Sequence, residues 1–223
     1  MLLLFDIDGT LVRSRPLAHQ RAMARAAIEV LGLPESTDEN SVRAVEPWGK
    51  TDLWILDDLV AASGRAEPPT DDELERWERA ACAAYVELED GEADDTDRRH
   101  AVVLEQMKDA GHDLALVTGN LELIARRKLE LRGLGHYFPA GQGGFGSDGR
   151  DRAELVRLAR RRAGDPPAEG TVLIGDTPLD VAAALAAGVR CIGVTGSRYG
   201  RAELLDAGAA AAVDELDELD RHL

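Results

Sequence analysis

Residues 1–12 read MLLLFDIDGTLV and join a strand-like apolar run to two closely spaced carboxylates. The apolar run Leu2–Phe5 leads directly into Asp6 and Asp8, and a Gly-Thr pair follows at once. A short apolar run that ends in turn residues predicts a buried strand. Two like charges therefore stand two residues apart at the carboxyl end of a strand, and this arrangement needs a chemical explanation.

Three further apolar runs predict strands that are buried on both faces. They cover residues 114–117, 172–174 and 191–194, and none has the polar alternation of a half-exposed strand. Helical periodicity separates them at residues 121–131 and at Arg152–Arg162. This alternation predicts an α/β fold in which helices flank a Rossmann-like parallel sheet.

The segment between the first two predicted strands breaks the alternation. From about residue 15 to residue 94, apolar residues recur at helical spacing, as in residues 74–88, and no strand-like run occurs. We therefore expect an α-helical domain of residues 15–94, inserted after the first strand into a core domain of residues 1–14 and 95–223.

The chain is strongly acidic, and its charge is unevenly distributed. Its 223 residues carry a net charge of −16, and residues 35–97 hold 20 acidic against 5 basic side chains. Such a surface repels phosphate backbones, so a nucleic-acid partner is not expected. No apolar stretch approaches the ~20 residues of a membrane span, and the N-terminal run lacks a basic flank. We expect a cytoplasmic protein without a membrane partner, present as a monomer or weak dimer.

Polar motifs lie at the carboxyl ends of three predicted strands. They are DIDGT at residues 6–10, VTGN at residues 117–120 and GDTPLD at residues 175–180, and Lys128 lies on the helix after VTGN. The carboxyl ends of parallel strands meet at one edge of a sheet, where ligands bind. Side chains more than a hundred positions apart are therefore expected to converge on one site.

Taken together, these motifs resemble the haloacid dehalogenase-like superfamily, specifically its magnesium-dependent phosphatase branch. The resemblance rests on DxDGT, a Thr at the end of the second core strand, a downstream Lys and GDxxxD, which span Asp6 to Asp180. GDxxxD or TGN taken alone is weak, because Gly, Asp, Thr and Asn occupy turns after strands for ordinary backbone reasons. The helical insertion resembles the cap of phosphoglycolate phosphatase-like members, which closes over the phosphate site.

The resemblance implies a role for each carboxylate. Asp6 is the expected nucleophile, whose attack on phosphorus gives an aspartyl-phosphate that water then hydrolyses. Asp8 is the expected general acid and base, which protonates the leaving alkoxide and then takes a proton from the attacking water. The expected cofactor is Mg²⁺, held by the carboxylates of Asp6 and Asp176 and the backbone carbonyl of Asp8. A shared cation would explain why like charges stand together here.

The resemblance also assigns residues around the phosphate. Lys128 is expected to bind phosphate and the Asp6 carboxylate, and a plain surface lysine is the alternative. Asp180, four residues after Asp176, is expected to accept metal-bound water or to orient Lys128. An acidic residue at that position is also a common feature of helix starts. The residues expected to contact phosphate are Gly9, Thr118, Gly119, Asn120 and Lys128.

Substrate choice is expected to depend on the helical insertion. Its segment PWGKTD, residues 47–52, resembles the cap loop that faces the substrate in many relatives, with Gly49 and Lys50 as the substrate-facing residues. Lys50 would suit a small substrate that carries a second anionic group, and a solvent-exposed loop lysine is the alternative.

The activity that the resemblance implies is hydrolysis of a small phosphorylated metabolite, in the class of phosphomonoesters that includes phosphoglycolate. A phosphomutase of the β-phosphoglucomutase kind is the nearest alternative, because it shares the nucleophile, the metal and the cap. A dehalogenase fits less well, since that branch needs no Mg²⁺ and lacks the acid/base residue of DxDGT. A non-catalytic binding scaffold is a further alternative, which the presence of the complete motif set disfavours.

Overall fold

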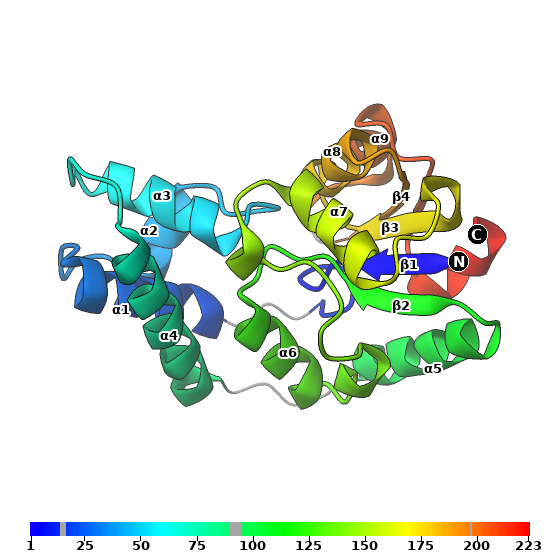
Figure 1. Cartoon of the computed structure of the whole chain (residues 1–223), viewed down its shortest axis with the longest axis horizontal. Helices are drawn as coiled ribbons and strands as arrows, with labels where there is room; N and C mark the ends of the chain where they lie inside the picture. The colour runs from blue at the N-terminus through cyan, green and yellow to red at the C-terminus, as the bar shows by residue number, and fades with distance from the viewer. Residues whose placement is uncertain (14–16, 90–94, 197) are drawn as a thin grey trace.

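The computed structural model describes residues 1–13, 17–89, 95–196 and 198–223. Its core is one five-stranded sheet in the order β2-β1-β3-β4-β5, and every neighbouring pair is parallel. Because β1 is paired with both β2 and β3, the residues that follow it emerge between the ends of two other strands (Figure 1). The strands are β1 (Leu2–Phe5), β2 (Asp113–Leu116), β3 (Thr171–Gly175), β4 (Arg190–Val194) and β5 (Ala211–Val213).

Helices cover both faces of the sheet. Successive residues of a strand point to opposite faces, so each strand packs against helices on both sides. Leu3 and Phe5 of β1 pack with apolar side chains of α5 and α6. Leu2 and Leu4 pack with those of α7, α8 and α9 on the other face. These helices are α5 (Asp95–Asp109), α6 (Glu122–Leu131), α7 (Arg152–Arg162), α8 (Pro178–Ala186) and α9 (Arg201–Asp206), with short 3₁₀ turns at η1 (Gly135–Tyr137), η2 (Gly146–Asp148), η3 (Ala168–Gly170) and η4 (Leu216–Arg221).

Among the described residues between β1 and α5, four helices form a bundle beside the sheet, the α1–α4 bundle (Figure 1). Its apolar side chains, including the fully buried Trp77, form their own cluster, which Leu121 and Ile124 of the sheet region join. Side-chain oxygens of Thr51 and Thr70 cap the starts of α3 and α4. The helices are α1 (Ala18–Leu31), α2 (Glu39–Ala44), α3 (Asp52–Ala62) and α4 (Asp71–Leu88).

The predicted α/β fold and its parallel sheet are confirmed, and the four predicted strands occur within one residue of their expected bounds. Strand β5 escapes prediction because its Ala-Ala-Val sequence has little β propensity and gains its conformation by pairing with β4. The expected domain boundaries touch residues 14–16 and 90–94, which lie outside the described residues, so the two-domain division stays a prediction. In the described part of the chain, no helix combines the length and apolarity that a bilayer crossing requires.

Candidate active site

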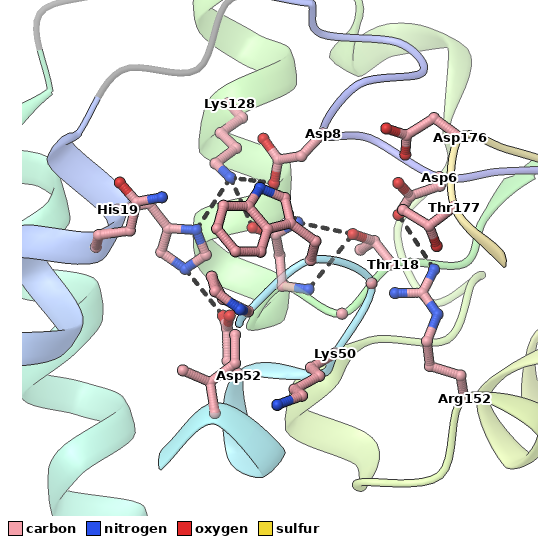
Figure 2. A pocket seen from close by; sticks show the side chains of 17 residues that line it. Asp6, Asp8, His19, Lys50, Asp52, Thr118, Lys128, Arg152, Asp176 and Thr177 are labelled. Carbon is pink, nitrogen blue, oxygen red and sulfur yellow. Dashed lines mark hydrogen bonds and ion pairs between the residues drawn. The ribbon is translucent and has the colours of Figure 1, made fainter. Parts of the chain in front are cut away.

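The predicted motifs meet at a cavity of about 120 Å³ between the carboxyl edge of the sheet and the α1–α4 bundle. The ends of β1, β2 and β3 supply Asp6, Thr118 and Asp176, and the bundle supplies residues 47–50. Figure 2 shows the side chains in two groups on opposite sides of the cavity. We define the acidic half as Asp6, Asp176 and Arg152, together with Asp180, which pairs with Arg152 but does not line the cavity. The lysine half consists of Asp8, Lys128, His19 and Asp52, together with Asn120.

The acidic half concentrates negative charge in a buried place. The carboxylates of Asp6, Asp176 and Asp180 each offer an oxygen within 4.8 Å of the others, and all three residues are buried. Burial, followed by the charges of Asp180 and Asp176, raises the pKa of Asp6 well above its usual value, although Arg152 opposes the shift. A bound cation would favour the ionised form of Asp6, so the electrostatics and the hard oxygen donors fit a divalent metal.

Arg152 is the cation of the acidic half, and it is not among the site residues predicted from the sequence. Its guanidinium lies 3.5 Å from Asp6 and forms a closer ion pair with Asp180. A signal exists in the sequence, because Arg152 shares one helical face with Leu155, Val156 and Ala159 at i, i+3, i+4 and i+7. An arginine on an apolar face at the start of a helix, where the macrodipole favours acidic residues, indicates a buried partner.

Asp180 supports the acidic half in a different way from the expected one. One carboxylate oxygen pairs with Arg152, and the other accepts from the Thr177 amide at 3.0 Å and its hydroxyl at 2.7 Å. These bonds complete a capping box at the start of α8. The expectation that Asp180 orients Lys128 is therefore corrected: this carboxylate orients Arg152.

The lysine half is a hydrogen-bonded cluster around one ammonium group. Lys128 donates to Asp8 Oδ2 at 2.5 Å and to Asn120 Oδ1 at 2.6 Å, and it lies 3.2 Å from His19 Nδ1. Asn120 Nδ2 also donates to Asp8 Oδ2 at 2.8 Å. Burial raises the pKa of Asp8, but the positive charge of Lys128 outweighs this effect and lowers the pKa to about 2.

The expected contact between Lys128 and Asp6 is thus corrected as well. Lys128 is buried and lines the cavity, but its ammonium contacts Asp8, and Arg152 takes the position beside Asp6. Asp6 and Asp8 lie in different halves of the site (Figure 2), so two cations serve two carboxylates separately.

The remaining phosphate-binding candidates surround the cavity unevenly. Thr118 lines it, and its hydroxyl accepts from Asn120 Nδ2 at 2.7 Å. Gly119 also lines it and must be glycine, because an added Cβ would lie 2.2 Å from the carbonyl oxygen of Lys50. Gly9, with φ of +98°, turns the chain, and its amide donates to Val12 O at 2.9 Å.

The loop of residues 47–52 lines the cavity from the side of the bundle. Gly49 has φ of +79° and packs so closely that a Cβ would lie 2.6 Å from Thr177 Oγ1. Lys50 also lines the cavity, but its ammonium donates to Asp58 at 2.8 Å and to Val45 O at 2.6 Å. A second anionic group on a substrate would have to compete with Asp58 for this charge.

Comparison with known proteins identifies the family. Residues 1–188 match the family model described as haloacid dehalogenase-like hydrolase. The chain therefore belongs to the haloacid dehalogenase-like hydrolases. Within that family it is a phosphatase that resembles the phosphoglycolate phosphatases, which are its relatives by sequence. Phosphatases of this family generally use a divalent metal, and the acidic half provides a suitable donor set.

Two curated relatives and two solved structures illustrate the likeness. Phosphoglycolate phosphatase 1 of Pseudomonas aeruginosa is 30% identical over 224 residues, which is 98% of this chain and 78% of that protein. Phosphoglycolate phosphatase of Pseudomonas putida is 31% identical over 205 residues, or 90% of this chain and 71% of that protein. CbbY from Rhodobacter sphaeroides, solved with xylulose-(1,5)bisphosphate, has a TM-score of 0.71 at 26% identity, covering 98% of this chain and 95% of its own. A Bacteroides vulgatus structure, provisionally described as a beta-phosphoglucomutase, has a TM-score of 0.69 at 23% identity and shares the fold. The match covers 99% of this chain and 86% of that one.

Proposed function

We propose that the chain is a Mg²⁺-dependent phosphatase that hydrolyses a small phosphomonoester through an aspartyl-phosphate on Asp6. The observation that carries the proposal is the placement of Asp6 in the acidic half, beside Asp176 and Arg152, with Asp8 across the cavity. A nucleophile and an acid/base residue in one cavity, each with its own cation, suit a two-step phosphoryl transfer.

Asp6 attacks phosphorus in the first step, and the bond to the ester oxygen breaks as the bond from the carboxylate forms. Asp8 gives a proton to the leaving alkoxide. In the second step Asp8 takes a proton from water, whose oxygen attacks phosphorus and releases Asp6 and inorganic phosphate. The negative charge of a bound phosphoryl group raises the pKa of Asp8 and so favours its protonated, acid form. Arg152 neutralises charge beside the nucleophile.

Asp6 and Asp176, with the backbone carbonyl of Asp8, would hold the Mg²⁺. When bound, the ion offsets the repulsion between the substrate phosphate and the attacking carboxylate. Both carboxylate oxygens of Asp180 already accept hydrogen bonds, from Arg152 and from Thr177, so its role is to orient Arg152 beside Asp6.

The substrate class follows from the small cavity and from the names of the relatives. A cavity of about 120 Å³ suits a phosphate group on a short carbon chain. We infer that the α1–α4 bundle is the cap that encloses it, because loop residues 47–50 line the same cavity. A panel of phosphorylated metabolites, assayed for inorganic phosphate with Mg²⁺ and with EDTA, tests the function. Release that needs Mg²⁺ supports it; transfer to sugar without release favours a phosphomutase, and no reaction with any ester refutes both.

Mg²⁺ is expected to raise the melting temperature of the metal-free protein, because an ion that binds only the folded chain stabilises it. At a hundred times its dissociation constant the gain is ~2.7 kcal/mol. For a chain of this size, this corresponds to a shift of roughly 5–10 °C. Thermal denaturation with increasing Mg²⁺ measures the effect. Asp176→Asn should lose most of the shift, and an undiminished shift in that variant would place the ion elsewhere.

Arg152→Ala is expected to lower kcat/KM by roughly 10²–10³-fold, because the charge beside the nucleophile is no longer compensated. Arg152→Lys should recover part of the loss, since an ammonium keeps the positive charge but differs from the guanidinium in reach and donor geometry. Steady-state kinetics on variants shown to be folded by thermal denaturation provide the measurement. Arg150→Ala, which removes an exposed arginine two residues away, is the matched control and should change little. Parent-like kinetics in Arg152→Ala would exclude the role.

A further inference from the structure

A continuous line of hydrogen bonds runs from the α1–α4 bundle to Asp8 (Figure 2). His19 Nε2 lies 3.0 Å from Asp52 Oδ2, and His19 Nδ1 lies 3.2 Å from Lys128 Nζ. The same ammonium donates to Asp8 Oδ2 at 2.5 Å. Two side chains of the bundle, on α1 and α3, thus stand behind the lysine that contacts Asp8.

The donors and acceptors in this line fix the tautomer of His19. An ammonium carries three N–H donors and no acceptor. Lys128 directs these donors to Asp8 Oδ2, Asn120 Oδ1 and His19 Nδ1. Nδ1 must therefore accept, and the ring proton resides on Nε2, from which it is donated to Asp52. A neutral imidazole with its proton on Nε2 satisfies both neighbours.

Asp52 is in turn held by the sheet region. It is 2% exposed, and the oxygen that accepts from His19 also accepts from the Leu121 amide at 2.8 Å. Leu121 is the N-cap residue of α6, whose own side chain provides no cap, so a carboxylate from α3 satisfies this helix start. The Asp52 amide donates to Gly119 O at 2.8 Å. The geometry around Lys128 therefore depends on contact between the bundle and the sheet edge.

We propose that His19, oriented by Asp52, is a positioning residue for Asp8. It fixes the Lys128 ammonium, and through it the Asp8 carboxylate, at the place where Asp8 exchanges protons. Because His19 and Asp52 belong to the bundle, the acid/base residue is fully positioned only while the bundle is seated on the sheet edge. The inference rests on the proposed function, in which Asp8 is the proton donor and acceptor.

Two substitutions separate the two contacts of His19. In His19→Gln, the side-chain amide reaches the Nε2 position and keeps the contact with Asp52, but one Lys128 donor loses its acceptor. In His19→Asn, the side-chain oxygen lies where Nδ1 lay and still accepts from Lys128. His19→Gln is expected to lower kcat/KM for an alkyl phosphate by roughly 10- to 100-fold. The kcat/KM of p-nitrophenyl phosphate, which covers only the steps up to release of the leaving group, should change little, because this leaving group departs without a proton. His19→Asn should retain more activity toward the alkyl phosphate than His19→Gln.

Asp57→Asn is the matched control. Asp57 also lies on α3 and bridges to the sheet region, with Arg150 Nη2 donating to it at 2.9 Å, but it makes no contact in the line to Asp8. Asp57→Asn should leave the ratio of the kcat/KM values for the two substrates unchanged. In an Asp8→Ala background, His19→Gln should cause no further loss with the alkyl phosphate, because His19 acts through Asp8.

Equal losses of kcat/KM on both substrates in His19→Gln, or an additive loss in the double variant, would overturn the proposal, since both are signs of a general structural role. Nitrogen-15 NMR of the imidazole rings tests the arrangement without catalysis, with the His19 signals assigned by their absence in His19→Gln. A proton on Nε2 is expected, and a proton on Nδ1 would overturn the proposal. If the parent releases no phosphate from any ester, the proposed function fails, and the NMR result still decides the arrangement.

Discussion

Asp6→Asn is expected to abolish phosphate release, with a loss of roughly 10⁴-fold or more, while the fold remains intact. The amide keeps the shape of the carboxylate but cannot attack phosphorus. Release of inorganic phosphate from the best ester of the panel, in excess Mg²⁺, measures the loss. Turnover comparable with that of the parent would show that the nucleophile is another residue.

The same substitution should stabilise the metal-free protein at neutral pH. Burial and the neighbouring carboxylates raise the pKa of Asp6 in the folded chain. A carboxyl group with a raised folded-state pKa contributes stability that is present below its unfolded pKa and is lost as pH rises through the folded value. Near pH 7 Asp6 therefore opposes folding, and the amide removes this penalty. A higher melting temperature for metal-free Asp6→Asn than for the metal-free parent is the expected observation.

Trapping provides a third readout on Asp6 that needs no turnover. Beryllofluoride mimics an aspartyl-phosphate, so with Mg²⁺ it should bind the parent and fail to bind Asp6→Asn. Fluorine NMR distinguishes the protein-bound from the free species. Equal binding to both proteins would place the phosphoryl acceptor elsewhere, even if Asp6→Asn were inactive for another reason.

The part of the site that lies at strand ends could be predicted from the sequence. Asp6, Thr118 and Asp176 each follow a short apolar run, and parallel strands end at one edge of a sheet. Their convergence therefore follows from the order of strands alone. The cavity at that edge, lined by all three residues, agrees with this reasoning.

The partners of these residues could not be predicted in the same way. The position of Lys128 on the helix after VTGN indicates that it lies near the site. It does not show which carboxylate the ammonium contacts, because Asp6 and Asp8 are two residues apart and point into different halves of the site. His19 and Arg152 come from other elements, and their roles depend on how α1 and α7 pack against the sheet edge. Each is a polar residue within a helix that buries its neighbours, and this signal predicts burial without naming the partner.

Asp8→Ala is expected to lower kcat/KM for alkyl phosphates by ~10²–10⁴-fold, the usual contribution of a general acid. The loss should be far smaller for p-nitrophenyl phosphate, whose leaving group is stable without a proton. Comparison of kcat/KM for the two substrates, each relative to the parent, measures the difference, because kcat/KM reports the steps up to release of the alcohol and excludes the later hydrolysis, in which Asp8 serves both substrates alike. The loss measured for Asp8→Ala is also the upper limit for the loss in His19→Gln, because a residue that positions Asp8 cannot contribute more than Asp8 itself.

A second variant separates the acid role of Asp8 from its role as a partner of Lys128. The alanine leaves the Lys128 ammonium, whose side chain is 7% exposed, with Asn120 and His19 but without a carboxylate, so the folded state loses stability. Asp8→Asn keeps an oxygen that accepts from Lys128 but cannot exchange the proton. It should therefore show the same selective loss on alkyl phosphates with a smaller drop in melting temperature. If Asp8→Asn instead restored turnover of alkyl phosphates, the carboxylate would serve to hold Lys128, and the proton would have to come from another group.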